Sequence, residues 1–183
     1  MAYQFSAILF ESSGQQIDAK TLLERVGFPD GVSAGYTTFV EAINPILGTR
    51  TVGSTDSWTM MTDSSGFISV KMTAPFGQMW SPYVQKTLTS VTADGTRAFA
   101  FIFSPLSKSF GFSEFANGTH LRSKMVSLGR VSTDSGDPFP EEAEAFQEEQ
   151  GDRAILKLME LRGIPFRAFE QMPFEVFTYG SRF

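Results

Sequence analysis

Apolar and polar positions alternate along the chain in short blocks, which predict strands interspersed with helices. The clearest strand is the segment 96–103, TRAFAFIF, in which three phenylalanines share one face and the intervening Ala and Ile side chains share the other. Because both faces are apolar, we expect a central strand that is covered on both sides. Similar apolar-rich runs predict a first strand at Tyr3–Phe10 and a last strand at 173–180.

Helical spacing and terminal residues predict helices between these strands. Each predicted helix has an apolar stripe together with a capping, proline or glycine signal at an end. They are a short helix that Asp18 caps, a helix at Pro82–Val91, an acidic helix at Pro140–Gln150, and a helix that Asp152 caps and Gly163 ends.

Two hairpins complete the predicted arrangement. One spans residues 57–72 around the turn 63–66, and the other joins Ser109–Ala116 to Thr119–Val126. The polar segment Gly48–Asp56 is expected to be an exposed loop, and the pattern at Phe39–Ile43 is ambiguous. We therefore predict an α+β fold in a single domain (1–183), with a mainly antiparallel sheet of about five to seven strands and three to four helices packed on it.

The Asn117–Gly118 pair predicts a tight two-residue turn and therefore the register of the second hairpin. The expected cross-strand pairs are Ala116 with Thr119, Phe115 with His120, Glu114 with Leu121, and Ser113 with Arg122. One face then carries Phe110, Phe112, Leu121 and Met125, with Glu114 as a discordant acid near the tip.

The opposite face of this hairpin is expected to be polar and basic. It holds His120, the only histidine of the chain, together with Arg122 and Lys124. These three side chains are a candidate site for an anionic group of a ligand or partner. The alternative is that His120 is only a partly solvated cross-strand neighbour of Phe115, with a structural role.

The segment 31–35 reads GVSAG and matches the G-x-S-x-G pattern in which the serine, here Ser33, is a nucleophile. Candidate triad partners follow it in the chain: Asp56, Asp63, Asp94 and His120. The motif requires a strand that turns sharply into a helix, whereas here a helix end precedes Ser33 and a β-prone run follows it. We therefore assign no catalytic residue, and a hydrolase based on Ser33 stays an alternative.

Acidic residues are concentrated between positions 131 and 152, where eight Asp and Glu occur without any Lys or Arg. Outside this segment the chain has 15 basic and 12 acidic residues, a net charge of +3, against −5 for the whole chain. Asp134, Asp137 and Glu141 offer oxygen ligands for a divalent cation, but their spacing matches no EF-hand loop. Glu141, Glu144 and Glu148 are instead expected to form an acidic helix face suited to a basic partner.

Composition narrows the possible functions further. The chain has no cysteine, no run of about 18 apolar residues, no phosphate-binding glycine loop and no concentrated basic stripe. We therefore expect a cytoplasmic protein with no cofactor, no nucleic-acid partner and no membrane partner. Nineteen phenylalanines are suited to a core or an interface, and Trp80 and Tyr83 are candidate recognition aromatics if their loop exposes them.

Three short motifs in the C-terminal half resemble those of a loose group of uncharacterised bacterial α+β proteins. They are F-x-N-G at Phe115–Gly118, L-R at Leu121–Arg122, and G-[DE]-P-x-P-x-E at Gly136–Glu141. The resemblance implies a domain built on an antiparallel sheet. It implies no activity and no functional residue.

The preferred hypothesis is a non-enzymatic binding or interaction protein, of an immunity-like or accessory kind, with a protein partner or self-association. It depends on the absence of a complete catalytic pattern, the abundance of aromatic residues and the segregated acidic segment. One alternative is a small hydrolase that uses Ser33 or a metal held by Asp134, Asp137 and Glu141. Another is a homo-oligomeric structural protein whose phenylalanines form the subunit interface.

Overall fold

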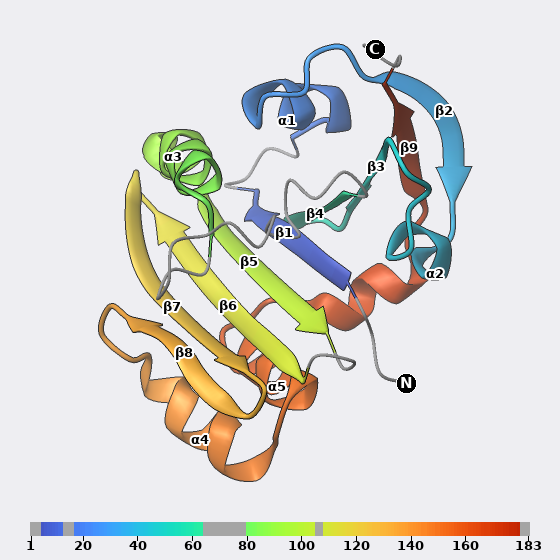
Figure 1. Cartoon of the computed structure of the whole chain (residues 1–183). Helices are drawn as coiled ribbons and strands as arrows, with labels where there is room; N and C mark the ends of the chain where they lie inside the picture. The colour runs from blue at the N-terminus through green and yellow to red at the C-terminus, as the bar shows by residue number, and fades with distance from the viewer. Residues whose placement is uncertain (1–4, 13–16, 64–79, 105–107, 180–183) are drawn as a thin grey trace.

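The computed structural model describes residues 5–12, 17–63, 80–104 and 108–179, and its nine strands form one antiparallel sheet (Figure 1). The strands in chain order are β1 (Phe5–Glu11), β2 (Val32–Thr37), β3 (Thr49–Ser54), β4 (Trp58–Asp63), β5 (Arg97–Ser104), β6 (Ser109–Ala116), β7 (Thr119–Ser127), β8 (Arg130–Ser135) and β9 (Phe174–Thr178). Across the sheet their order is β2-β9-β3-β4-β1-β5-β6-β7-β8, so β2 and β8 are its two edges.

Helices pack on both faces of this sheet. The α-helices are α1 (Ala19–Arg25), α2 (Phe39–Ala42), α3 (Pro82–Val91), α4 (Pro140–Glu148) and α5 (Asp152–Leu161), and the 3₁₀ helices are η1 (Thr92–Asp94) and η2 (Phe166–Gln171). The predicted mixture of helices with an antiparallel sheet is confirmed. The predicted numbers are too low, because the described residues hold nine strands and seven helical segments.

The first core lies between the sheet and the side that carries α2, α4, α5 and η2. Phe99, Phe101 and Phe103 of β5 all point into it, and none exposes more than 1% of its surface. Aromatic rings meet edge to face there, with 5.3 Å between the centroids of Phe5 and Phe101. The phenylalanine-rich face of the predicted central strand is therefore confirmed as a core face.

The second core lies on the opposite face, beneath α1 and α3 (Figure 1). Ala98 and Ala100 of β5 point into it and meet apolar side chains of both helices, among them Leu22 and Leu88. Because successive side chains of a strand point to opposite faces, β1 and β5 contribute alternately to the two cores. Both central strands are thus buried on both sides.

The segment Gly48–Asp56 is not the exposed loop that its polar composition predicts. It contains β3, which lies inside the sheet between β9 and β4 and is buried from Thr49 to Gly53. Its hydroxyl groups are satisfied locally, since Thr51 Oγ1 lies 2.7 Å from Thr62 Oγ1, and Thr62 Oγ1 donates to the Ala42 carbonyl at 2.6 Å. Paired threonines take the place of an apolar stripe, so the hydrophobic pattern does not reveal this strand.

The first predicted hairpin is only partly tested. Its first arm is β4, which ends at Asp63, and the second arm lies outside the described residues. Within the described chain β4 pairs with β1 and β3. The hairpin between β6 and β7 has the expected bounds to within one residue, and Asn117 and Gly118 both have the positive φ of its tight turn.

The N-termini of α1 and α3 follow their sequence signals. Asp152, the expected cap of the last helix, is instead the first residue of α5, and Gly151 is its N-cap. Asp18 accepts a hydrogen bond from Thr21 N at the start of α1, and Ser81 with Pro82 begins α3. The ambiguous segment at 39–43 is α2, which begins with a capping box between Thr38 and Glu41. None of the helices in the described part of the chain has the length and apolar character needed to cross a bilayer.

Candidate functional site

The hairpin that carries His120 contains a β-bulge that the sequence analysis did not predict. Ala116 pairs with Thr119 and Phe115 with His120, as expected, but Glu114 then pairs with Arg122. Leu121 is therefore an extra residue, and the predicted pairs of Glu114 with Leu121 and of Ser113 with Arg122 are wrong. Because the side-chain period of a strand is two, one extra residue exchanges the faces of the residues beyond it.

The bulge turns Arg122 into the protein, where 1% of its surface is exposed. Its Nε and Nη2 donate to Glu142 at 2.7 and 2.9 Å, and its Nη1 donates to Asp134 at 2.5 Å. Nη1 also lies 3.1 Å from the carbonyl oxygens of Ser135 and Gly136. The guanidinium thus ties β7 to the end of β8 and to α4, and it is buried away from any ligand in solution.

The ionisation of this pair is strongly stabilised. The hydrogen bonds to Glu142 raise the pKa of Arg122, against the opposing effect of burial. Burial raises the pKa of Glu142, but the hydrogen bonds from Arg122 and from the Phe139 N–H outweigh it, so that the pKa of Glu142 is lowered. The pair is therefore charged at neutral pH and holds the two elements together.

Two of the three motifs of the sequence resemblance contribute residues to this clamp, the Leu-Arg pair and the segment that begins at Gly136. The Asn-Gly turn and the Leu-Arg pair make the hairpin tip and the bulge, and the segment that begins at Gly136 runs past them to Glu142. A Cβ atom on Gly136 would lie 2.0 Å from the carbonyl oxygen of Leu121, so only glycine fits there. In this chain the Leu-Arg pair and the Gly136 segment therefore have a structural role.

Glu114, the discordant acid of the predicted apolar face, is explained by the arginines that lie beside it on the same face of the sheet as Arg122. It is 1% exposed and accepts hydrogen bonds from Arg97 Nε at 2.7 Å and from Arg162 Nη2 at 2.8 Å. Arg162 in turn covers the ring of Phe139, with 3.7 Å from its guanidinium carbon to the ring centroid. Glu114 is thus a buried carboxylate between two guanidinium groups.

The predicted anion-binding trio is not a single group. Lys124 shares the α4 face with Arg122, with its Nζ 3.5 Å from Glu142 and 4.2 Å from the centroid of the Phe146 ring. His120 pairs with Phe115, which belongs to the opposite core. The bulge therefore separates the histidine from the two cations that the regular register placed beside it.

His120 ends a chain of hydrogen bonds on the α3 face of the sheet. Its Nε2 lies 2.6 Å from Ser123 Oγ, Ser123 contacts Ser113, and Trp80 Nε1 donates to Ser113 at 2.5 Å. Burial lowers the pKa of His120, and the nearby Arg122 charge also lowers it, against a backbone contact that raises it. The imidazole is therefore neutral at pH 7 and lies against Phe115, with 5.0 Å between the ring centroids.

This arrangement also locates the two candidate recognition aromatics. Trp80 has no exposed surface and donates its indole N–H to Ser113 Oγ, so it belongs to the core. Tyr83, in the first turn of α3, is 58% exposed, so only this aromatic of the two lies at the surface.

Ser33 and His120 do not converge. Ser33 lies in β2 at one edge of the sheet and His120 in β7, next to the other edge. Seven strand spacings separate them, which at about 4.8 Å each amounts to roughly 34 Å along the sheet. The triad of the hydrolase alternative is therefore not assembled.

The acids proposed as metal ligands are engaged in ion pairs. Asp134 contacts Arg122, and Glu141 contacts Arg162 Nη1 at 3.2 Å. Asp137 is exposed in the turn before α4. No cluster of three or more His, Asp or Glu side chains suited to a metal ion occurs within the described residues.

The acidic face of α4 is partly neutralised by α5. Lys157 Nζ lies 3.7 Å from Glu144 and 3.9 Å from Glu148, both of which are more than half exposed. Together with the contact between Glu141 and Arg162, each acid of the predicted face has a cation of the α5 region beside it. The face is therefore less negative than the sequence implies.

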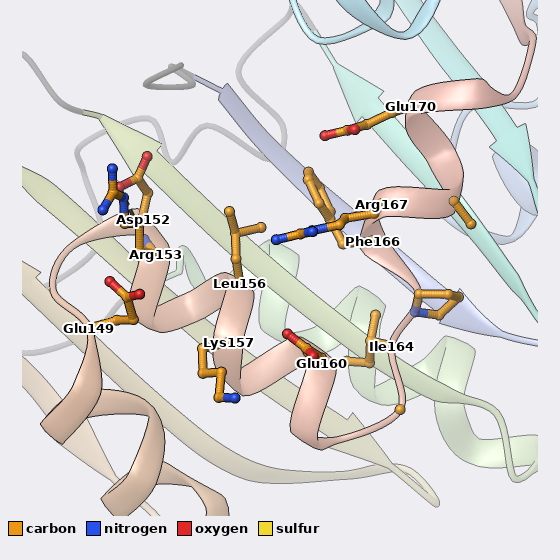
Figure 2. A pocket seen from close by; sticks show the side chains of 13 residues that line it. Glu149, Asp152, Arg153, Leu156, Lys157, Glu160, Ile164, Phe166, Arg167 and Glu170 are labelled. Carbon is orange, nitrogen blue, oxygen red and sulfur yellow. Dashed lines mark hydrogen bonds between the residues drawn. The ribbon is translucent and has the colours of Figure 1, made fainter.

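A concave surface lies elsewhere, between α5 and η2, and has a volume of about 910 Å³ (Figure 2). Its apolar part consists of Leu156 from α5, Ile164 from the connecting loop and Phe166 from η2. Ile164 and Phe166 are anchored in the core beneath, where Phe166 contacts the ring of Phe39 at 5.8 Å between centroids. We call this surface the α5–η2 groove.

Helical periodicity explains why charged residues surround the groove. In α5 the residues Ile155, Leu158 and Met159 face the core, so that Arg153, Lys157 and Glu160 face outward at i, i+4 and i+7. In η2 the period of three buries Phe166 and Phe169 and turns Arg167 and Glu170 outward. Figure 2 shows Arg167 extending from η2 toward α5, with Leu156 rising between them.

The charges around the groove are of both signs. The cations are Arg153, Lys157 and Arg167, and the acids are Glu149, Asp152, Glu160 and Glu170. Lys157 is held by α4, but within the described part of the chain the guanidinium groups of Arg153 and Arg167 have no ion-pair partner. These two side chains are available to an acidic group of a ligand.

A second, more apolar depression of about 490 Å³ adjoins the groove. Phe103, Phe110, Val126 and Phe146 line it. Glu149 and Asp152, at the corner between α4 and α5, line both depressions. The α5–η2 groove was not predicted from the sequence, although the outward spacing of Arg153, Lys157 and Glu160 indicates a charged face on α5.

Comparisons with known proteins add no further assignment. No protein-family model, no curated protein and no solved structure matches this chain.

Proposed function

We propose that the chain is a non-enzymatic binding protein that receives a short segment of a partner protein in the α5–η2 groove. The observation that carries this proposal is the groove itself, with its apolar floor and its rim of charged side chains. Binding sites are typically concave and combine apolar surface with polar groups that orient the ligand, and this groove combines the two with charged residues predominant in its lining. A volume of about 910 Å³ lies within the range of such sites.

The chemistry of the lining favours binding over catalysis. Its residues include no serine, threonine, tyrosine or histidine, so it offers neither a hydroxyl nucleophile nor an imidazole base. The only histidine is used in the hydrogen-bonded chain beneath α3, and Ser33 lies at the far edge of the sheet. Both observations support a binding role.

The rim suggests what kind of segment the groove would accept. Arg153 and Arg167 present guanidinium groups without intramolecular ion-pair partners in the described chain, and these favour carboxylates of a ligand. Glu160 supplies a negative group on the same rim. A peptide with an apolar side chain for the floor and acidic and basic groups on either side fits this pattern.

Selection of peptides from a phage-displayed library against the immobilised protein tests the proposal. The selected peptides are expected to perturb the amide NMR signals of α5 and η2. Arg167→Glu should weaken their binding, measured by calorimetry, by about tenfold or more, because it replaces a charge-assisted hydrogen bond with a repulsion.

Arg130→Glu is the matched control, since it makes the same charge change at an exposed position on β8. It should leave the affinity within about twofold, as expected of a charge outside the site. Peptides whose signals map away from the groove, or whose affinity falls equally in both variants, would contradict the proposal.

A further inference from the structure

The edge strand β2 is exposed along almost its whole length. Every residue from Val32 to Tyr36 is exposed, and only Thr37 is half-buried. Within the described chain its strand neighbour is β9 alone, so its other side has no strand partner (Figure 1). An edge strand of this kind directs half of its backbone N–H and C=O groups outward, where they can pair with another extended chain.

This edge lacks the charges that usually prevent such pairing. Residues 31–40 contain no Asp, Glu, Lys or Arg and no proline. The opposite edge, β8, carries both Arg130 and Asp134. A bulge between Ser33 and Gly35 bends β2 but adds no charge to it.

Exposed apolar side chains are concentrated around the same edge. Five of the nine large hydrophobic side chains that are exposed in the described chain belong to residues 32–47: Val32, Tyr36, Val40, Ile46 and Leu47. Their exposed fractions run from 64% for Val40 to 86% for Leu47. No phenylalanine is among the nine.

We propose that β2 is a self-association surface, at which the β2 strands of two copies pair antiparallel across a two-fold axis. We call this surface the β2 edge. An antiparallel strand pair is symmetric, so any extended edge is complementary to a second copy of itself, and the sheet continues from one copy into the next. Tyr36 and Val32 lose water contact in this arrangement.

The neutral edge favours a second copy over a charged segment, because residues 31–40 offer no charge to pair with such a segment and an identical edge brings none. The whole chain has a net charge of −5, so two copies repel each other over most of their surfaces. The neutral stretch 31–40 is where two identical edges meet without opposing like charges. This argument is independent of the α5–η2 groove, which lies on α5 and η2 and leaves β2 free for a second copy.

Sedimentation-equilibrium centrifugation of the full chain tests the proposal. The wild type is expected to dimerise reversibly, and Tyr36→Lys should raise the dimer dissociation constant by about tenfold or more, because it replaces an aromatic ring at the pairing edge of each copy with a lysine, the residue that protects natural edge strands from pairing. Val131→Lys is the matched control, at a position that is 59% exposed on β8, and it should leave the constant unchanged. Circular dichroism establishes that both variants are folded.

Single-cysteine variants locate the contact, since the chain has no cysteine of its own. Mild oxidation of whichever of Ser33→Cys and Ala34→Cys lies at the two-fold axis should yield a disulfide-linked dimer, because symmetric antiparallel pairing brings the two identical Cα atoms at the axis within disulfide range. Ser132→Cys on β8 should remain monomeric under the same conditions.

A wild type that is monomeric at its highest soluble concentration would overturn the proposal. A dimer that the Val131→Lys variant weakens as much as Tyr36→Lys does would place the contact elsewhere and also overturn it. Binding of an unrelated extended peptide to the β2 edge of a monomeric chain would assign the surface to a different occupant.

Discussion

At the scale of single residues, the contacts of Arg122 and Glu142 matter most for stability. Both side chains are almost fully buried, and removal of one partner leaves the other charged and uncompensated. We expect Glu142→Ala to lower the free energy of unfolding by about 3 kcal/mol, measured by urea denaturation at neutral pH. Glu144→Ala, at an exposed position on the same helix, is the control and should cost about 0.5 kcal/mol or less. Equal costs would mean that Arg122 finds sufficient partners in Asp134 and the two carbonyl groups.

The same pair predicts a pH dependence of stability. The pKa of Glu142 is lower in the folded protein than its ordinary value of 4.5, so its contribution is complete above that value. It is lost as the pH falls below about 4.5 and through the folded pKa, because the unfolded state takes up the proton more readily than the folded state does. The stability difference between wild type and Glu142→Ala should therefore shrink in that range, and a constant difference would contradict this origin.

Residue patterns predicted the hairpin but not the faces beyond its tip. Asn117–Gly118 specified the turn, and the pair of Phe115 with His120 follows from it directly. The bulge at Leu121 then placed Arg122, and not Leu121, opposite Glu114. The turn residues do not reveal this, because the contact that buries Arg122 is with Glu142, which is distant in sequence. The one local signal was Glu114, an acid on an apparently apolar face, since a buried carboxylate requires a buried cation.

At the scale of secondary-structure elements, the bulge makes an unusual prediction about deletions in β7. Deletion of Leu121 removes the extra residue and leaves the pairs of Phe115 with His120 and of Glu114 with Arg122 intact. Deletion of Ser123 is accommodated only if Leu121 takes the place opposite Glu114, which moves Arg122 to the other face and breaks its clamp. We expect the second deletion to cost at least about 2 kcal/mol more than the first. Equal losses in urea unfolding would show that the bulge does not set the register.

Helices and strands were predicted where a local sequence signal determines their structure. They were missed where contacts with residues distant in sequence determine it. The helices α1, α3 and α4 follow their caps and prolines, and α2 had a readable capping box at Thr38 and Glu41. Strands β3 and β8 carry polar side chains, and their structure depends on neighbours in the sheet. The groove was missed for the same reason, because it exists only where η2 returns beside α5.

At the scale of the whole molecule, the sheet separates two cores but does not make them independent. Phe5, Ala7 and Leu9 of β1 enter one core, while Ile8 and Phe10 enter the other. Loss of either core therefore exposes one face of the same central strands. This interleaving predicts that both cores unfold in one cooperative transition.

The two tryptophans report separately on the two cores, since Trp58 belongs to the core beneath α5 and Trp80 to the core beneath α3. In the single-tryptophan variants Trp58→Phe and Trp80→Phe, fluorescence and far-ultraviolet circular dichroism should give the same urea midpoint within each variant. Trp80→Phe is expected to be the less stable of the two by about 1 kcal/mol, because it leaves Ser113 without its indole donor. Fluorescence and circular dichroism midpoints that differ within one variant would mean that a face of the sheet can open alone, and β1 and β5 would then not couple the two cores.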